Sequence, residues 1–380
     1  MSARLTAWLD VLQAGQPGAA GWAAALAHYG DIEALRAAPR AGLREFGLND
    51  ATVQRLRSPD AQLLSSWRHW LEAPQHHLAT IDQPEFPPRL AQCPGAPLAL
   101  WLRGEQRDLL AAPALAIVGS RNASAGGRDN AQAFAQALGA SGLAIVSGLA
   151  LGIDAAAHVG ALNSAGGTVA VLGNGIDEIY PPENAALAQR IEASGLIVSE
   201  YGPGTPPRRH RFPARNRIIA ALSYGVLVVE AGSRSGSLIT ARLAGEFGRE
   251  VFAIPGSIHN PLSRGCHQLI RQGARLVETA DDVLQELAPA LRAALAAPAE
   301  YGVEPIRDAR EAGCGAPQPA PTLAPEYQRL LDSIGFDPSD ITTIVRRSTL
   351  TTAEVSSMLL LLELEGHVEA LPGGRYARTP

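Results

Sequence analysis

The amino-acid sequence predicts an α/β protein whose core is a Rossmann-like, doubly wound parallel sheet. Short, continuously apolar runs follow one another along the middle of the chain, at 115–118, 143–146, 168–172, 196–199, 226–229, 251–254 and 275–277. Segments with helical spacing separate these runs, at 127–138, 153–163, 184–193, 214–221, 238–247 and 262–271. Strands without polar alternation are typical of parallel sheets whose two faces are both covered by helices. Ligands of such sheets bind beyond the carboxyl ends of the strands, so we expect the site in the loops that follow them.

Length and composition place the chain among globular proteins with a large core. It has 380 residues, of which 46% are hydrophobic and 18% charged, which is enough for two or three domains. No stretch approaches the roughly eighteen apolar residues of a membrane span, and no basic segment leads into an apolar run, so we expect neither secretion nor membrane insertion. The three cysteines form no CxxC motif, which excludes the usual zinc spacings and disulfide frameworks and fits a cytoplasmic location.

The basic residues of the chain are of one kind only. The formal net charge is −5, which by itself does not indicate a nucleic-acid partner. The sequence contains no lysine, so all 32 basic residues are arginines. We attribute this to the base composition of the genome. Its physical consequence is that any phosphate contact uses the planar, bidentate guanidinium group.

Residues 1–75 are predicted to form a small helical domain of the SAM or helix-hairpin-helix type. Apolar residues recur there with helical spacing, and glycines and prolines divide the segment into short helices. Such domains bind nucleic acid or protein, and a structural or docking role is favoured here. Residues 76–290 are assigned to the extended core. Its beginning, 76–112, is rich in proline and is interpreted as an approach segment that ends in a candidate edge strand at 98–102.

The end of the chain is predicted to be a linker followed by a second small domain. Residues 291–322 are rich in alanine and proline, which is typical of a linker. Residues 323–380 contain three helical patterns and a hairpin around a Pro-Gly-Gly turn, and this arrangement resembles a winged helix. The helix at 352–365 would enter a major groove, but it contains glutamates and no arginine. Contact with protein is therefore favoured over recognition of duplex DNA.

Three loops with glycine and serine follow predicted strands and are candidate anion sites. Their candidate residues are Gly119, Ser120 and Arg121 in the first loop, Ser147, Gly148 and Gly152 in the second, and Ser235, Gly236 and Ser237 in the third. Glycine lets a ligand approach the backbone, and N–H groups at a helix N-terminus stabilise an anion. Glycine is common in turns between strands and helices, so a packing role explains each loop alone. Three such loops, two of them with an arginine, favour an anion site.

The common nucleotide-binding motifs are absent. The first strand is not followed by G-x-G-x-x-G, and no acidic residue ends the second strand to hold a ribose. A G-x-x-x-x-G-K-[ST] loop is excluded because the chain has no lysine. We therefore expect no cofactor and no metal site.

The segment 208–217 carries five arginines in ten residues. No acidic residue lies between Tyr201 and Val229, whereas a solvated surface normally mixes both signs. Because Phe212 is embedded in the run, a groove for a polyanion such as nucleic acid is favoured over a solvated face. The chain is only 5% aromatic, so we expect contacts with phosphates and little readout of bases. The candidate contacts are Arg215, Asn216 and Arg217.

The sequence contains only weak signs of enzymatic chemistry. Glu230 and the loop that follows it resemble an arrangement in phosphoribohydrolases that cleave nucleoside monophosphates, and this is the alternative function. Asp154 and His158 lie four residues apart on one predicted helix, where a catalytic pair could form. A capping or packing role for Asp154 and a hydrogen-bonded, buried His158 are the favoured interpretations.

In their order along the chain, these motifs resemble the DprA/Smf family, the DNA-processing proteins of natural transformation. The resemblance covers about residues 80–287, while the flanking domains match the family only in layout. The matching segments are Ile117–Arg121, Ser147–Ala150, Gly152–Asp154, Ala157-His158, Tyr180-Pro181, Glu183-Asn184, Ser199–Tyr201, Phe212–Ile219, Ser235–Thr240 and Ile254–Ser257.

The resemblance implies a protein that is not an enzyme. It implies binding of single-stranded DNA in the core pocket, protection of incoming DNA, loading of the RecA recombinase and formation of a homodimer. Arg121 matches the arginine with which the family grips DNA. The dimer surface of the family corresponds to His267, Ile270 and Leu276, although core packing explains the last two equally well. Many members have lysine where this chain has Pro182, so one expected phosphate contact is missing.

Overall fold

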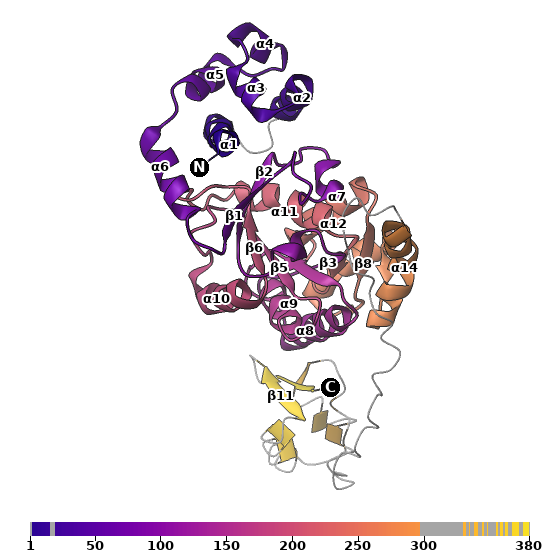
Figure 1. The fold of residues 1–380 in the computed structure, drawn as a ribbon. Helices are drawn as coiled ribbons and strands as arrows, with labels where there is room; N and C mark the ends of the chain where they lie inside the picture. Colours follow the sequence, from indigo (N-terminus) through magenta and orange to yellow (C-terminus); the bar gives the residue numbers. More distant parts are fainter. Residues whose placement is uncertain are drawn as a thin grey trace. The chain divides into compact units, whose positions relative to one another are not determined.

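The structure, a computed structural model, describes residues 2–15, 20–296 and part of the segment 330–379. The chain divides into two compact units, Met1–Arg307 and Asp308–Pro380. Figure 1 shows the course of the chain. Among the described helices, none combines the length and the apolar character that a membrane crossing requires.

A nine-stranded sheet forms the core of the first unit, in the order β1-β2-β6-β5-β4-β3-β7-β8-β9. The strands from β3 to β9 run parallel to one another, whereas β1 and β2 are antiparallel to their neighbours. The predicted parallel sheet is confirmed, and each predicted strand agrees with an observed one to within one residue at each end. The bounds are β1 His76–Thr80, β2 Ala99–Arg103, β3 Ala114–Val118, β4 Ala144–Ser147, β5 Thr168–Leu172, β6 Leu196–Ser199, β7 Gly225–Val228, β8 Glu250–Ala253 and β9 Arg275–Leu276.

The edge of the sheet differs from the prediction. The candidate edge strand at 98–102 is β2, but it lies inside the sheet between β1 and β6. The outer strand is β1, in a segment that was interpreted as an extended approach. β1 pairs with β2 along its whole length, from His76 opposite Arg103 to Thr80 opposite Ala99. An edge strand needs to bury only part of its surface, and the two histidines of β1 conceal the apolar pattern from which strands are predicted.

Helices cover both faces of the sheet, as expected for a doubly wound fold (Figure 1). One layer contains α7 Pro88–Ala91, α11 Arg211–Leu222, α12 Ser237–Glu246 and α13 Arg264–Arg271. The opposite layer contains α8 Ala125–Ala140, α9 Ile153–Ala161, α10 Ala185–Ser194 and α14 Ala280–Ala296. Val283 and Leu287 pack α14 in the core, and the helix extends past residue 291 into the predicted linker, whose start we expect to be partly helical.

The chain reverses its direction of travel across the sheet at β3. From β3 it proceeds to β4, β5 and β6 on one side, and it then returns to place β7, β8 and β9 on the other side. The loops that follow β3 and β7 therefore leave neighbouring strands and lead to opposite helical layers. In open α/β sheets, such a topological switch point is where ligands bind.

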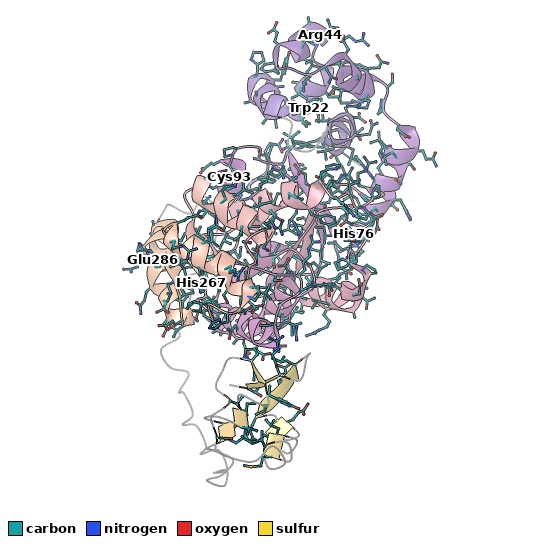
Figure 2. The ribbon with its side chains drawn as sticks, turned by 180° about the vertical axis from the view of Figure 1, so that it is seen from behind. Trp22, Arg44, His76, Cys93, His267 and Glu286 are labelled. Carbon is teal, nitrogen blue, oxygen red and sulfur yellow. The ribbon has the colours of Figure 1, made fainter. Side chains whose placement is uncertain are left out.

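The first five N-terminal helices contribute to a hydrophobic cluster that includes Trp22 (Figure 2). The six N-terminal helices are α1 Ala3–Ala14, α2 Ala20–Tyr29, α3 Ile32–Ala37, α4 Arg40–Glu45, α5 Asp50–Arg57 and α6 Ala61–Trp70. The last of them packs against the sheet. Trp67 of α6 lies 5.1 Å from Trp101 of β2 between ring centroids, and its indole N–H donates to the Pro203 carbonyl at 3.0 Å. Aromatic contact and a satisfied indole N–H together fix α6 on the core.

The second unit contains a three-stranded sheet in the order β10-β12-β11, with bounds Ser339–Asp340, Arg375–Arg378 and Val368–Leu371. β11 and β12 pair antiparallel, as predicted for the two strands of the hairpin. Leu330, Ile344 and Val355 belong to its hydrophobic core. Most of the acidic helix predicted at 352–365 lies outside the described residues.

Candidate nucleic-acid interface

A cavity of about 710 Å³ opens at the switch point of the sheet. Its walls are the loops after β3, β7 and β8 and the first turns of α11, α12 and α13, and the lining also includes Ala150 and, in α9, Asp154. The predicted site residues that line it are Gly119, Ser120, Arg121, Arg215, Asn216, Ser235, Gly236 and Ser237. The predicted site residues that lie outside its lining are Ser147, Gly148, Gly152 and Arg217.

The loop after β3 is joined to the loop after β7. The Ser120 N–H donates to the Glu230 carbonyl at 2.7 Å. Gly119 makes this approach possible, because a Cβ at its position would lie 2.8 Å from the same carbonyl oxygen. Arg121 follows directly and is exposed, with no hydrogen bond or ion pair to any residue that the structure describes. Its guanidinium group is therefore available to a ligand.

The loop after β7 offers free backbone donors to the cavity. The N–H groups of Gly232, Ser233, Arg234 and Gly236 have no acceptor within the described part of the chain. They lead into α12, whose N-cap makes no side-chain hydrogen bond. Unpaired N–H groups before a helix N-terminus form a cradle for an anion. That this loop binds an anion stays a prediction.

In the loop after β4, where we predicted an anion site, the N–H groups of Gly148, Leu149 and Ala150 are already bonded within the protein. The Asp154 carboxylate accepts from Gly148 N–H at 3.1 Å and from Ala150 N–H at 3.4 Å. Ser147 is fully buried and donates its hydroxyl to the Ile117 carbonyl at 2.7 Å. Gly152, with φ +78°, lets α9 approach the Ser120 carbonyl. These contacts fix the loop beside the cavity, and within 148–152 the N–H groups of Leu151 and Gly152 have no acceptor among the described residues, so anion binding there stays a prediction.

His158 completes this buried network in its neutral form. Its Nε2 accepts from the Leu149 N–H at 3.3 Å, so Nδ1 carries the proton and donates to Thr168 Oγ1 at 2.7 Å. The Thr168 hydroxyl in turn donates to the Ile145 carbonyl at 2.7 Å. Burial, reinforced by the charge of Arg215, lowers the pKa of His158 to about 3. The favoured interpretation of a buried, hydrogen-bonded histidine is thus consistent with the structure.

Arg215 lines the bottom of the cavity, but its guanidinium group is committed to the protein. Its Nη1 donates to the Gly148 carbonyl at 2.7 Å and also to the Val171 carbonyl. Burial lowers the pKa of Arg215 to about 10, while the charge of Asp154 opposes this shift. Burial likewise raises the pKa of Asp154, against the effects of Arg215 and the two loop N–H groups. The two opposite charges stabilise each other beneath the site.

The arginine run 208–217 does not form one uncompensated surface. Arg217 donates from Nη2 to Glu200 Oε1 at 2.5 Å and from Nε to the Gly95 carbonyl at 2.8 Å, which turns it away from the cavity. Asn216 does line the cavity and donates to the Gly236 carbonyl at 3.4 Å. Arg211 stacks over the Tyr201 ring at 4.8 Å. The acidic partner of Arg217 precedes the acid-free stretch of the sequence, so local charge counting misses it.

The exposed positive charges of the cavity are Arg121, Arg234 and Arg264. None of the three has an ion-pair partner among the described residues. Our sequence prediction did not include Arg234 and Arg264 as site residues. Arg234 belongs to the third candidate loop, and Arg264 begins the helix that follows β8. The rule that ligands bind beyond the carboxyl ends of strands would have identified both.

An aromatic pair stands at one side of the cavity. Phe212, which lines it, lies 5.4 Å from the Tyr180 ring between centroids, with the rings tilted by 34°. The Arg121 guanidinium carbon lies 5.9 Å from the centroid of Phe212. Tyr180 is 43% exposed. Neighbouring aromatic faces beside a cation suit a ligand that combines flat rings with negative charge.

Glu230 has a structural role in this geometry. Its carboxylate accepts from Ser124 N–H at 2.9 Å and from the Ser124 hydroxyl at 2.6 Å, at the N-terminus of α8. A Cβ on Gly127 would lie 2.4 Å from the carboxylate, so the helix packs directly on it. The side chain is buried and does not line the cavity. The alternative function, which required Glu230 as a catalytic group, receives no support from this arrangement.

The residues matched to the dimer surface of the family lie at the other end of the sheet. Leu276, in the edge strand β9, is 49% exposed. Ile270 is half-buried and packs on the core, and His267 Nε2 contacts the Gly256 carbonyl at 2.9 Å. Leu276 is thus the exposed apolar residue of the three. Pro182, where many family members have lysine, is exposed and lies outside the cavity lining.

The buried His158 predicts a loss of stability in acid. The unfolded chain takes up a proton near pH 6.5, but native His158 remains neutral down to about pH 3. From pH 7.5 to pH 5.0 this difference costs about 2 kcal/mol of unfolding free energy. For His158→Gln we expect a lower free energy of unfolding at pH 7.5. Between pH 7.5 and pH 5.0 this free energy should fall by about 2 kcal/mol less than in the wild type, as measured by urea unfolding. Parallel pH profiles for the two proteins would contradict the assignment.

Family models and relatives agree with this architecture. The model described as DNA recombination-mediator protein A matches residues 77–288, and the model described as the DprA winged helix domain matches residues 315–374. Among curated relatives, protein Smf of Escherichia coli is 41% identical over 337 residues, which cover 88% of this chain and 86% of that protein. The DNA processing protein DprA of Streptococcus pneumoniae is 51% identical over 201 residues, 53% of this chain and 71% of that protein.

Solved structures give the same result. The crystal structure of DprA from S. pneumoniae is similar with a TM-score of 0.65 at 40% identity, covering 73% of this chain and 95% of that one. DNA processing protein A from Helicobacter pylori, described in terms of its single-stranded DNA binding mode, is similar with a TM-score of 0.50 at 31% identity, covering 56% and 97%. The sequence motifs, the family-model matches, the relatives and the solved structures all indicate the same family. The chain belongs to the DprA/Smf family of DNA recombination-mediator proteins.

Proposed function

We propose that this protein binds single-stranded DNA in the cavity at the switch point and presents it to the RecA recombinase. The observation that carries the proposal is the cavity itself, in which three exposed arginines without acidic partners face free backbone N–H groups. The related H. pylori protein, whose structure concerns its single-stranded DNA binding mode, supports the choice of ligand.

The phosphates would be held by two kinds of donor. The N–H groups of the 232–236 loop have no internal acceptor among the described residues, and Arg121, Arg234 and Arg264 surround them. Guanidinium groups bind phosphate oxygens in a bidentate manner. Backbone N–H groups donate to phosphates whatever the base sequence, so binding of this kind is not sequence-specific. The contacts proposed from sequence at Arg215 and Arg217 act indirectly, because these side chains support the walls of the cavity.

A base would lie against the aromatic pair. Phe212 lines the cavity and Tyr180 is partly exposed beside it, so one face of the pair is open to a flat ring. A duplex keeps its bases stacked on each other, whereas a single strand can turn one out toward an aromatic side chain. This is the reason to propose single-stranded rather than duplex DNA.

Loading of RecA, protection of incoming DNA and formation of a homodimer belong to the same proposal. The family model that matches the core describes a recombination mediator. The open edge at β9, with exposed Leu276, supports a second copy as the partner at this end of the sheet. A dimer would hold two DNA segments, and no covalent bond would be made or broken.

Arg121→Ala should weaken binding of a fluorescent single strand of about 20 nucleotides by about tenfold or more, because it removes a charge-assisted phosphate contact. The log–log salt slope should become shallower by roughly 0.7. Binding is measured by fluorescence anisotropy across a salt series. Arg190→Ala, which removes an exposed arginine of α10 outside the cavity, is the matched control and should bind like the wild type.

Equal affinities for Arg121→Ala, Arg190→Ala and the wild type would exclude the cavity as the DNA site. In that case the hydrolase alternative is assayed directly, as release of ribose 5-phosphate from nucleoside monophosphates and its loss in Glu230→Ala. Duplex of the same length serves as competitor, and we expect it to displace the single strand poorly.

Phe212→Leu should weaken binding of the same strand by roughly 5- to 150-fold, the range of one lost base stack. Its salt slope should stay unchanged, since no phosphate contact is removed. Phe212→Tyr keeps the aromatic face and should retain most of the affinity. A shallower slope in Phe212→Leu, or equal weakening in both variants, would argue against a stacked base.

Mediator activity is tested on RecA itself. ATP hydrolysis by RecA on single-stranded DNA shows a lag while the filament assembles, and the wild-type protein should shorten this lag. Arg121→Ala should leave the lag unshortened, because the mediator must hold the DNA that it delivers. If Arg121→Ala shortened the lag as much as the wild type does, loading of RecA through this cavity would be refuted. The DNA affinity of the cavity would still be judged by the anisotropy measurements.

A further inference from the structure

A second cluster of arginines lies at the amino-terminal edge of the sheet, opposite the cavity. Arg249 directly precedes β8, Tyr224 directly precedes β7, and Arg89 belongs to α7, which packs on α11. The cavity residues described above follow these strands instead. Strands of four or five residues separate the two edges by roughly 13–17 Å. No residue of this cluster takes part in the proposed DNA site.

The cluster is held together by specific contacts. The Arg89 guanidinium carbon lies 3.7 Å from the centroid of the Tyr224 ring, and its Nη2 donates to the Ala112 carbonyl at 3.2 Å. Arg249 Nη2 donates to the Arg89 carbonyl at 3.4 Å. The thiol of Cys93 (labelled in Figure 2) donates to the same carbonyl at 3.1 Å. Two positive charges are therefore fixed beside each other next to a thiol.

Neither arginine has a counter-charge in the part of the chain that the structure describes. No ion pair to an acidic side chain is formed by either of them there, and nearby Glu246 is paired with Arg242. Arg89 Nη1 and Arg249 Nε are shielded from solvent and have no hydrogen-bond partner. Burial lowers the pKa of Arg89 to about 10, and the charge of Arg249 adds to this effect. Both arginines are half-buried, and two adjacent cations with shielded, unused donors are stabilised when an anion joins them.

We propose that Arg89 and Arg249 together bind a phosphate group. The tetrahedral oxygens of a phosphate accept hydrogen bonds from two guanidinium groups at once, and its charge neutralises both. A phosphate would reach Arg249 from a cavity of about 560 Å³ between α12 and α13, whose lining includes Glu250 but not Arg89. The phosphate belongs to a free anion or to a nucleic-acid backbone, and the proposal does not depend on DNA binding at the first cavity.

Cys93 provides a local readout of this site. Arg249 lowers the pKa of the Cys93 thiol by its charge and a hydrogen bond, although burial has the larger, opposite effect. A phosphate that binds Arg249 should raise the pKa of the thiol and so lower its thiolate fraction, and we expect alkylation by iodoacetamide to slow about tenfold. Cys266 is fully buried, and burial raises its pKa to about 11, so it reacts little. Replacing Cys314 by serine leaves Cys93 as the reactive thiol.

The experiment measures alkylation of Cys93 by mass spectrometry in the full chain carrying Cys314→Ser. Inorganic phosphate is titrated at constant ionic strength, with chloride as the reference salt. We expect slowing by phosphate in this protein and in Arg190→Gln, which removes an exposed arginine of α10 outside this cavity. In Arg249→Gln alkylation should be slow from the start and unaffected by phosphate.

No slowing by phosphate, or equal slowing in Arg249→Gln, would overturn the proposal. Arg121→Ala should leave the phosphate effect unchanged, so failure of DNA binding at the first cavity is distinguished from failure here. A single-stranded oligonucleotide without terminal phosphate identifies the source. If the oligonucleotide also slows alkylation of Cys93 in the Arg121→Ala background, the bound phosphate is that of a nucleic-acid backbone. If only inorganic phosphate slows alkylation, the ligand is a free anion.

Discussion

The close approach of β3 and β7 at the centre of the sheet is the constraint on which the rest of the site depends. The hydrogen bond of 2.7 Å from the Ser120 N–H to the Glu230 carbonyl joins the two loops where they leave neighbouring strands. The Glu230 carboxylate then holds the start of α8 through Ser124. Because the two loops lead to opposite helical layers, a cavity opens between them. A ligand there meets donors from both halves of the fold.

The arginines of the core fall into two groups according to what surrounds them. Arg215 and Arg217 point into the protein, where backbone carbonyls and Glu200 accept their hydrogen bonds. Arg121 and Arg234 point outward with no acidic partner among the described residues. Around the switch-point cavity, Arg215 and Arg217 are bonded within the protein, so the exposed arginines there remain for a ligand. A net charge of −5 is therefore compatible with an anion site.

The two ends of the parallel strands carry different kinds of cationic site. At the carboxyl ends, free N–H groups and an aromatic pair accompany the arginines, which suits a chain of phosphates with attached bases. At the amino ends, Arg89 stacks on Tyr224 and lies beside Arg249 without such a cradle. A compact site of this kind suits a single phosphate group. The distinction follows from the fold, because helix N-termini gather only at the carboxyl edge of a parallel sheet.

The sequence was sufficient to predict the parallel strands, the layers of helices and two of the three loops at the site, because burial on both faces leaves continuous apolar runs. It failed for β1, whose His76 and His77 hide an edge strand. The partners of polar groups were decided only by the tertiary structure. Asp154 and His158 occupy the N–H groups of the second loop, and Glu200 removes Arg217 from the cavity. Periodicity records burial along the chain, whereas a hydrogen bond or ion pair requires groups that only the folded sheet brings together.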